Sequence, residues 1–219
     1  MEAVFSLMAG LGLSAACGFR IFVPLTIMSL LAQLGWYQLS PELAWAASPL
    51  ALSGLLLATV LEIGAYYVPW LDNLLDAIAT PAAIGAGTLL TFGFVPGLDP
   101  FAQWSLALIA GGGLAGTIQA STVAARATST ATTGGLGNFV VATGEAFGAV
   151  VLALLALFLP VLAIVAVIGL LLAGVVLLRR LGERGREGRG KPCPYGWWAK
   201  MKGVSRRRGG ACPRPRHAA

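Results

Sequence analysis

Long apolar segments separated by short polar stretches make up most of this chain. Residues 3–34 form one apolar run, and residues 139–178 form another of about 40 residues in which Glu145 is the only charge. A membrane-spanning helix needs about 20 apolar residues. The second run is therefore twice the length of a span, and we expect it to fold back at Pro160.

The first run, at about 32 residues, is too long for one upright helix. It is interrupted at Gly18 and Arg20, and Pro24 follows. These residues indicate either a strongly tilted helix or a helix that is broken near Gly18. The next stretch, 35–47, carries two tryptophans and a tyrosine, which are typical of a membrane interface.

The pattern predicts an all-α fold, a polytopic transmembrane helical bundle of about six crossings. The predicted crossings are 3–34, 50–68, 74–95, 101–125 and two within 139–178. We expect residues 1–180 to form the transmembrane domain and residues 181–219 to form a basic, disordered tail.

The composition agrees with a membrane protein, because 57% of the residues are hydrophobic and 11% are charged, against about 25% charged in soluble domains. Residues 1–178 hold two basic and seven acidic side chains, whereas 179–219 hold thirteen basic and two acidic ones. The net charge of +6 is thus the sum of −5 in 1–178 and +11 in the tail, and it does not indicate a nucleic-acid partner.

A basic tail after the last apolar helix is expected to stay in the cytoplasm, where it can also bind anionic lipid. An even number of crossings then places the N-terminus in the cytoplasm too. In that arrangement the connections around 66–76 and 126–138 face the same side, and their opposite charges predict that they touch. A first segment that re-enters the membrane would change the parity of the count.

Several chemistries lack their side chains. The only histidine is His217, in the tail, and the three cysteines, Cys17, Cys193 and Cys212, form no ligand pattern. No G-x-S-x-G or Walker sequence is present. We therefore predict no catalytic residue, no metal site and no cofactor.

Charged residues inside apolar segments are the first candidates for function. Arg20 lies about 17 residues into its segment, where a buried arginine normally pairs with a carboxylate or lines a cavity. Glu62 and Glu145 lie inside apolar helices, and either could be its structural partner or a proton carrier.

The segment 66–81 holds the densest polar group. Asp72 and Asp76 are spaced four residues apart, so a helix presents both carboxylates on one face, next to Asn73. Such a pair favours a bound cation or proton, or a basic partner such as Arg126. A solvated helix start with Asp72 as its cap is the alternative.

The stretch 126–138 joins five hydroxyl side chains and three glycines to Arg126. Backbone N–H groups in such a loop can bind an anion, although a flexible connection would look the same. Because Arg126 ends a predicted helix, we expect water to solvate its loss. We therefore expect Arg126 to matter more for function, and the deeply buried Arg20 to matter more for folding.

A weak internal repeat relates 9–20 to 115–126 and 79–86 to 142–149. The two alignments differ in the number of residues that separate the matched segments, because the first half holds an additional predicted crossing. With that additional crossing, the two halves would have opposite orientations in the membrane. The sequence therefore suggests an inverted repeat, a feature that transporters often have.

Three motifs carry a family resemblance: GLSAACGFRIFVPL from Gly12, LDNLLDAIATP from Leu71, and STATTGGLGN from Ser129 followed by ATGE. With them the chain resembles the bacterial integral membrane family catalogued as domain of unknown function 4126, over about 3–180. Phe139 departs from the pattern, since members usually have proline there. The resemblance implies a multi-pass protein of the bacterial cytoplasmic (inner) membrane and assigns no activity.

Two functions remain open. The first is a small transporter or translocator of an anionic small molecule or lipid headgroup, and the second is a structural or regulatory membrane protein whose buried charges are ion pairs. An enzyme is the less favoured reading. The expected partners are membrane lipids, and a homo-oligomer is compatible with the sequence.

The candidate substrate-binding residues are Arg20, Asn73, Arg126, Thr132, Thr133, Gly134, Gly135 and Asn138. The candidate residues for proton or cation coupling are Glu62, Asp72, Asp76 and Glu145.

Overall fold

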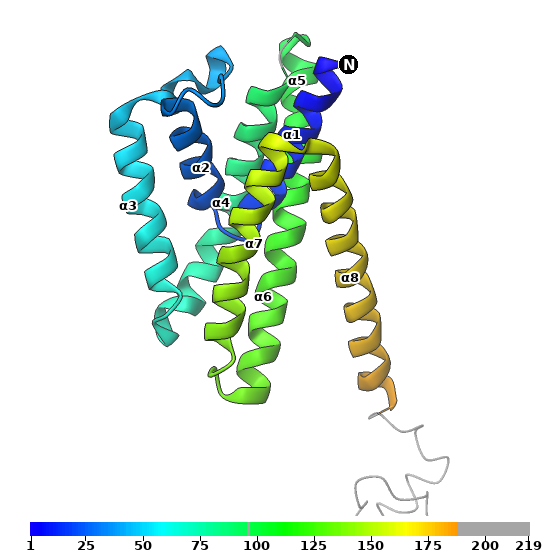
Figure 1. The fold of residues 1–219 in the computed structure, drawn as a ribbon. Helices are drawn as coiled ribbons and strands as arrows, with labels where there is room; N and C mark the ends of the chain where they lie inside the picture. Colours follow the sequence, from blue (N-terminus) through cyan, green and yellow to red (C-terminus); the bar gives the residue numbers. More distant parts are fainter. Residues whose placement is uncertain (96, 188–219) are drawn as a thin grey trace, which may run out of the picture. The chain divides into compact units, whose positions relative to one another are not determined.

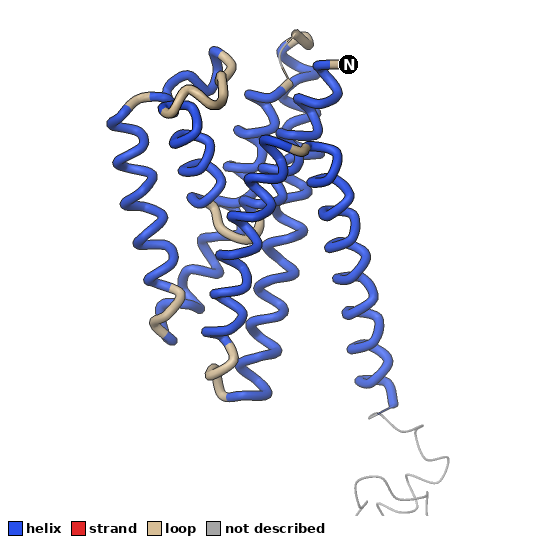
Figure 2. The backbone as a smooth tube through the Cα atoms, in the orientation of Figure 1, coloured by secondary structure: helices blue, strands red, loops and turns tan. Residues whose placement is uncertain are grey.

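The computed structural model describes the backbone of residues 1–95 and 97–187 and the side chains of residues 1–68, 75–95 and 97–176. Its regular structure is helical throughout these residues (Figures 1 and 2). The elements are α1 (Glu2–Cys17), α2 (Phe22–Gln33), the 3-10 helix η1 (Pro41–Ala47), α3 (Pro49–Ala65), α4 (Pro69–Phe94), α5 (Pro100–Leu106), the π-helix η2 (Ala107–Gly112), α6 (Gly113–Thr133), α7 (Asn138–Phe158) and α8 (Pro160–Glu187). The chain divides into two compact units, 1–171 and 172–219, and the packing described below lies within 1–171.

Proline and short capping side chains set the helix starts. The helices α3, α4, α5 and α8 each begin with a proline, whose missing N–H lies where an α-helix makes no internal bond. Ser48 accepts a hydrogen bond from the Ala51 N–H at 3.1 Å, and Asp99 accepts one from the Phe101 N–H at 3.1 Å. The fold-back predicted at Pro160 is confirmed, because α7 ends at Phe158 and α8 starts at Pro160.

Three helical segments are long and apolar enough to cross a membrane: Leu75–Phe94, Pro100–Thr133 and Asn138–Phe158. A fourth is the pair formed by η1 and α3, which bends by 74°. The apolar helices Glu2–Cys17, Phe22–Gln33 and Pro160–Val176 are shorter. The described chain is thus an all-α protein with three to four candidate membrane spans.

The outward surface of these helices is apolar. Only Leu55 and Glu62 are buried in α3, whereas Leu57, Val60 and Leu61 are 62%, 66% and 62% exposed. A soluble helix would place polar residues on that face. The arrangement suits a helix surrounded by lipid, with its one charged side chain turned inward.

The first apolar run is broken near Gly18. Of the two possibilities that the sequence left open, a tilted helix and a broken helix, the structure has the broken one. Helix α1 ends at Cys17 and α2 begins at Phe22. Both outer ends of this pair lie beside the same end of α4. Ser6 in α1 donates a hydrogen bond to the Phe94 carbonyl, and η1, which follows α2, packs Leu43 against Gly93.

The inner ends of α1 and α2 lie deep among the other helices. Ile21, in the connection between them, packs with Ala79 and Ala83 near the middle of α4. The pair is therefore a helical hairpin that enters the bundle and returns toward the same end, as Figure 1 shows for the two dark blue helices. Arg20 lies in its turn.

The inverted repeat suggested by the sequence is wrong. Helix α4 runs antiparallel to α1, because Ser6 donates to the Phe94 carbonyl and Ser14 to the Gly87 carbonyl. Helix α7 is antiparallel to α1 as well, because Gly12 approaches Ala156 whereas Arg20, just beyond α1, donates to the Ala142 carbonyl. Helix α6 is antiparallel to α4 in turn, since Arg126 meets Asp76 whereas Gly87 approaches Ala115. The matched pairs, α1 with α6 and α4 with α7, therefore run in the same directions. Because α2 returns toward the end of the bundle where α1 began, the first half has no additional crossing, and the two halves keep the same orientation.

The stretch 126–138 is also different from the predicted loop. Helix α6 continues to Thr133, and only Gly134–Gly137 form the turn to α7. Threonine hydroxyls that looked like loop chemistry donate to carbonyls four residues earlier, at 2.8 Å from Thr128 and 2.9 Å from Thr132. Gly134 and Gly135, at φ values of +63° and +94°, end the helix with a left-handed turn.

The hairpin gives a direct topological expectation. In a variant with Cys193 and Cys212 changed to serine, single cysteines introduced at Glu2 and Trp36 should react with a membrane-impermeant maleimide from the same side. A cysteine at Leu136, in the turn at the opposite end of the bundle, should react from the other side and serves as the control. Reaction of the first two positions from opposite sides would mean that 3–34 crosses the membrane once.

Candidate functional site

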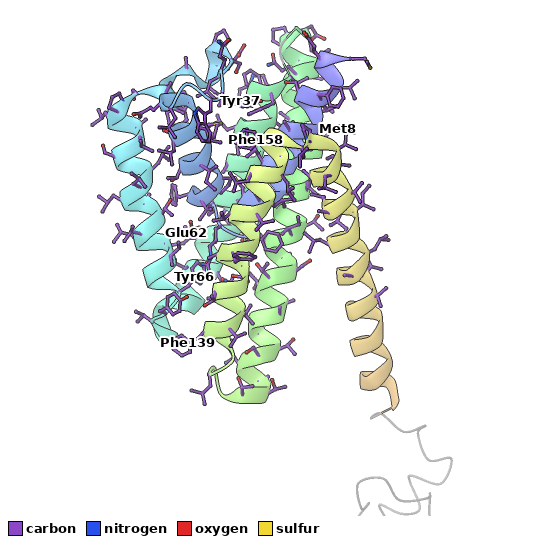
Figure 3. The ribbon with its side chains drawn as sticks, in the orientation of Figure 1. Met8, Tyr37, Glu62, Tyr66, Phe139 and Phe158 are labelled. Carbon is purple, nitrogen blue, oxygen red and sulfur yellow. The ribbon has the colours of Figure 1, made fainter. Side chains whose placement is uncertain are left out.

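Five charged residues from five separate segments converge inside the bundle. They are Arg20 in the α1–α2 turn, Glu62 in α3, Asp76 in α4, Arg126 in α6 and Glu145 in α7. Arg20 is 1% exposed and Arg126 is 2% exposed. Figure 3 labels Glu62 and, beside it at the end of α3, Tyr66, which is 4% exposed.

Helix lengths explain why these residues meet. Arg126 precedes the end of α6 by seven residues, and Glu145 follows the start of α7 by seven. Both therefore lie about 10 Å from the short turn that joins the two helices. Asp76 follows the start of α4 by the same seven residues. Equal spacing from neighbouring helix ends places the three side chains at one depth.

Arg126 bridges the two carboxylates. Its Nη1 donates to Glu145 Oε2 at 2.7 Å, and its Nη2 donates to Asp76 Oδ1 at 2.5 Å. Glu145 is 5% exposed and Asp76 is 14% exposed. The contact predicted between 66–76 and 126–138 is confirmed by the Asp76–Arg126 pair.

Arg20, from the α1–α2 turn, reaches the same carboxylate. Its Nη2 lies 3.3 Å from Glu145 Oε2 and donates to the Ala142 carbonyl at 3.0 Å. A single oxygen of Glu145 thus pairs with both arginines. The Nε and Nη1 groups of Arg20 are buried and have no hydrogen-bond partner among the described residues.

The aromatic ring of Tyr66 contacts both guanidinium groups. The Cζ atom of Arg20 lies 3.8 Å from the ring centroid, and that of Arg126 lies 4.4 Å from it. A cation over an aromatic face is stabilised by about 2 kcal/mol or more where water is excluded. Tyr66 therefore helps to hold two like charges near each other inside the bundle.

Glu62 caps the N-terminus of α2 at the break between α1 and α2. Its two carboxylate oxygens accept hydrogen bonds from the backbone N–H groups of Ile21 at 2.7 Å and Phe22 at 3.0 Å. These are the first N–H groups of α2, which have no partner inside the helix. The positive end of the α2 dipole also favours the negative carboxylate.

The described charges of this network largely offset one another. Asp76 and Glu145 face Arg20 and Arg126, and Glu62 faces the helix N-terminus, which carries roughly half a positive charge. This compensation matters because an uncompensated charge inside a membrane costs several kcal/mol. Among the described residues, no group of three or more His, Cys, Asp and Glu side chains is arranged to hold a metal ion.

Other candidates from the sequence lie elsewhere. Thr132, Thr133, Gly134 and Gly135 belong to the end of α6 and the following turn, about 10 Å along the helix from Arg126, and Asn138 begins α7. Asn138 donates from Nδ2 to the Thr130 hydroxyl at 3.0 Å. The side chains of Asp72 and Asn73 lie outside the described residues, although their backbone belongs to α4.

Sequence reasoning missed Tyr66, which it placed at the start of the polar segment 66–81 without a role of its own. Its position four residues after Glu62 was the available signal, because that spacing puts the two side chains on one helix face. Phe139, where the family pattern has proline, stacks on the neighbouring Tyr67 with ring centroids 5.8 Å apart.

Three to four apolar helices long enough to cross a membrane, around a buried network of arginines and carboxylates, indicate a multi-pass α-helical membrane protein. The chain belongs to the family described as domain of unknown function DUF4126, whose family model matches residues 7–180. The resemblance read from the motifs is therefore confirmed, and the matched region ends where the basic tail begins. No curated protein and no solved structure matches the chain.

The burial of Arg126 changes what we expect from its removal. Arg20→Ala and Arg126→Ala should each lower the free energy of unfolding by about 3–5 kcal/mol, because each removes one positive charge from a buried group of carboxylates. Unfolding of the purified protein in detergent measures this loss. A stable Arg126→Ala variant would restore the sequence expectation that water solvates that site.

The role of the Tyr66 ring has a matched test. Tyr66→Phe keeps the aromatic face and should leave the unfolding free energy nearly unchanged, whereas Tyr66→Leu should lower it by about 2 kcal/mol. The same detergent unfolding measurement compares the two variants. Equal effects of the two changes would mean that the ring acts only as an apolar filler.

Proposed function

We propose that this protein is a small membrane carrier for an anionic group, in which the anion and the Glu145 carboxylate compete for Arg20 and Arg126. One observation carries the proposal: a single oxygen of Glu145 pairs with both buried arginines, at 3.3 Å and 2.7 Å. An anionic oxygen in that position would make the same two contacts. Protonation of Glu145 would release both guanidinium groups to it.

The broken first segment supports this reading. Carriers often bind substrate where discontinuous helices meet inside the membrane, because their ends expose backbone groups that a continuous helix satisfies internally. Here Arg20 lies at such a break, and the N-terminus of α2 already binds the Glu62 carboxylate. The break is thus built to hold negative oxygen atoms.

Proton coupling follows from the charges of the network. An anion that entered would add negative charge beside the carboxylates, and a proton on Glu145 would offset one unit of it. Among the described groups, Arg20 from the turn and Arg126 from α6 face Glu145, and Asp76 from α4 faces it through Arg126. Anion affinity should therefore rise as the pH falls.

A topology of five crossings fits this carrier. The hairpin of α1 and α2 would enter and leave on one side, and α3, α4, α5 to α6, α7 and the apolar part of α8 would cross. The basic tail would then lie in the cytoplasm of a bacterial cell and the N-terminus on the outer side. The sequence expectation of six crossings, with both termini inside, needed a first segment that crosses.

The alternative is a structural or regulatory membrane protein. It is favoured by the directness of the three arginine–carboxylate contacts, all between 2.5 and 3.3 Å. In that case the network only holds the helices together, and the basic tail binds lipid or a partner. The two functions differ in what happens when the charge of Glu145 is removed.

Glu145→Gln separates the two functions. For the wild-type protein in detergent, inorganic phosphate and glycerol phosphate should raise the melting temperature, with affinity increasing up to tenfold for each unit of pH lowered. Glu145→Gln should bind the anions at neutral pH with little dependence on pH, because glutamine resembles the protonated acid.

Glu42→Gln, at an exposed site in η1, is the control and should behave as wild type. A lower melting temperature for Glu145→Gln together with no anion effect in either protein would favour the structural function and contradict the carrier.

A further inference from the structure

An apolar groove of about 510 Å³ lies between α7 and the first part of α8. Its walls include Phe19 from the α1–α2 turn, Gly144, Gly148 and Leu155 from α7, and Ala166 and Gly169 from α8. Its remaining lining is also apolar or glycine, so nothing in the groove would bind a polar ligand. The groove is part of a surface that the membrane surrounds.

Glycines keep this groove open, because they have no side chains to fill it. A Cβ atom added at Gly144, Gly148 or Gly169 would meet no atom within 4 Å. Glycines that serve helix packing behave differently: at Gly12 an added Cβ would lie 2.8 Å from the Cβ of Ala156 and 3.2 Å from that of Ala163. The groove glycines therefore leave free space rather than allowing close helix contact.

Two residues of the groove adjoin the charge network along the chain. Gly144 precedes Glu145, and Phe19 precedes Arg20, which donates to the Ala142 carbonyl at 3.0 Å. From Gly144 to Leu155 the groove follows eleven residues of α7, which corresponds to about 17 Å. The hydrocarbon of one membrane leaflet is about 15 Å thick, half of a 30 Å core. The groove thus has the length of one lipid chain.

We infer that the groove binds one acyl chain of an anionic phospholipid, whose phosphate lies at the Gly144 end, next to Arg20. A second observation points to an anionic group at this end: Arg20 is 1% exposed, and its Nε and Nη1 groups have no hydrogen-bond partner among the described residues. A buried N–H group without a partner is costly in a membrane, and phosphate oxygens would accept from it.

The inference rests on the proposed function and narrows its substrate to a lipid. A soluble anion would need the network alone. A lipid needs the network for its phosphate and the groove for its chain, so a variant that fills only the groove separates the two sources of the anion.

Cross-linking tests this inference. The purified protein is reconstituted in phosphatidylcholine vesicles that contain phosphatidylglycerol with a photoreactive group on one acyl chain, and the attached peptides are identified by mass spectrometry. We expect attachment to α7 between Phe147 and Leu155 and to α8 between Ala166 and Leu170. Gly148→Leu should reduce it at least fivefold, and Gly169→Leu, on the facing helix, is the second variant.

Gly85→Leu is the matched control. Gly85 lies in α4, and an added Cβ there also meets no atom within 4 Å, so this change should leave the labelling unchanged. Stabilisation by soluble glycerol phosphate should survive Gly148→Leu, because that variant leaves the arginines in place.

Three results would overturn the inference. Equal labelling by photoreactive phosphatidylcholine would mean that the groove does not select an anionic lipid. Links between two copies of the protein at these peptides would assign the groove to an oligomer interface. Stabilisation by glycerol phosphate without groove labelling would leave the carrier with a soluble substrate, whereas the absence of both effects would refute the proposed function as well.

Discussion

The Glu145 carboxylate holds the described bundle together, because one of its oxygens pairs with arginines from two different segments. Neither Arg20 nor Arg126 could remain charged among apolar helices without such a partner. Asp76, Glu62 and Tyr66 complete the arrangement, so that α3, α4, α6, α7 and the α1–α2 turn all meet at one depth. Van der Waals packing of small residues brings these helices close, and the network fixes their register.

The hairpin of α1 and α2 is the feature that this network makes tolerable. A chain that breaks inside a membrane exposes backbone N–H groups, and each one left without a partner costs several kcal/mol. Glu62 accepts from two of them, while Arg20 in the same turn donates to the Ala142 carbonyl and pairs with Glu145. The interruption is therefore stabilised from α3 on one side and from α7 on the other.

The sequence predicted the composition of the site better than its geometry. Arg20, Glu62 and Glu145 were identifiable because a charge in an apolar segment must face inward, and the Asp76–Arg126 contact followed from opposite charges on one side. The anion-binding loop at 126–138 was a misreading of α6, whose threonines satisfy their hydroxyls within the helix and so need no loop. Because that helix was ended too early, the equal distances of Arg126 and Glu145 from the turn at 134–137 could not be recognised. The direction of the returning α2 depends on contacts with α3, α7 and η1 that no local pattern records.

The distance along the chain between Arg20 and its partner has a consequence for biosynthesis. Glu145 follows Arg20 by about 125 residues, which at about 5–20 residues per second separates their synthesis by about 6 to 25 s. During that interval Glu62 is the acidic side chain in contact with the turn, among the described residues, that has already been made. Arg20 gains its carboxylate partner only when Glu145 has been synthesised, so the ion pair that holds the α1–α2 turn against α7 forms late in the growth of the chain.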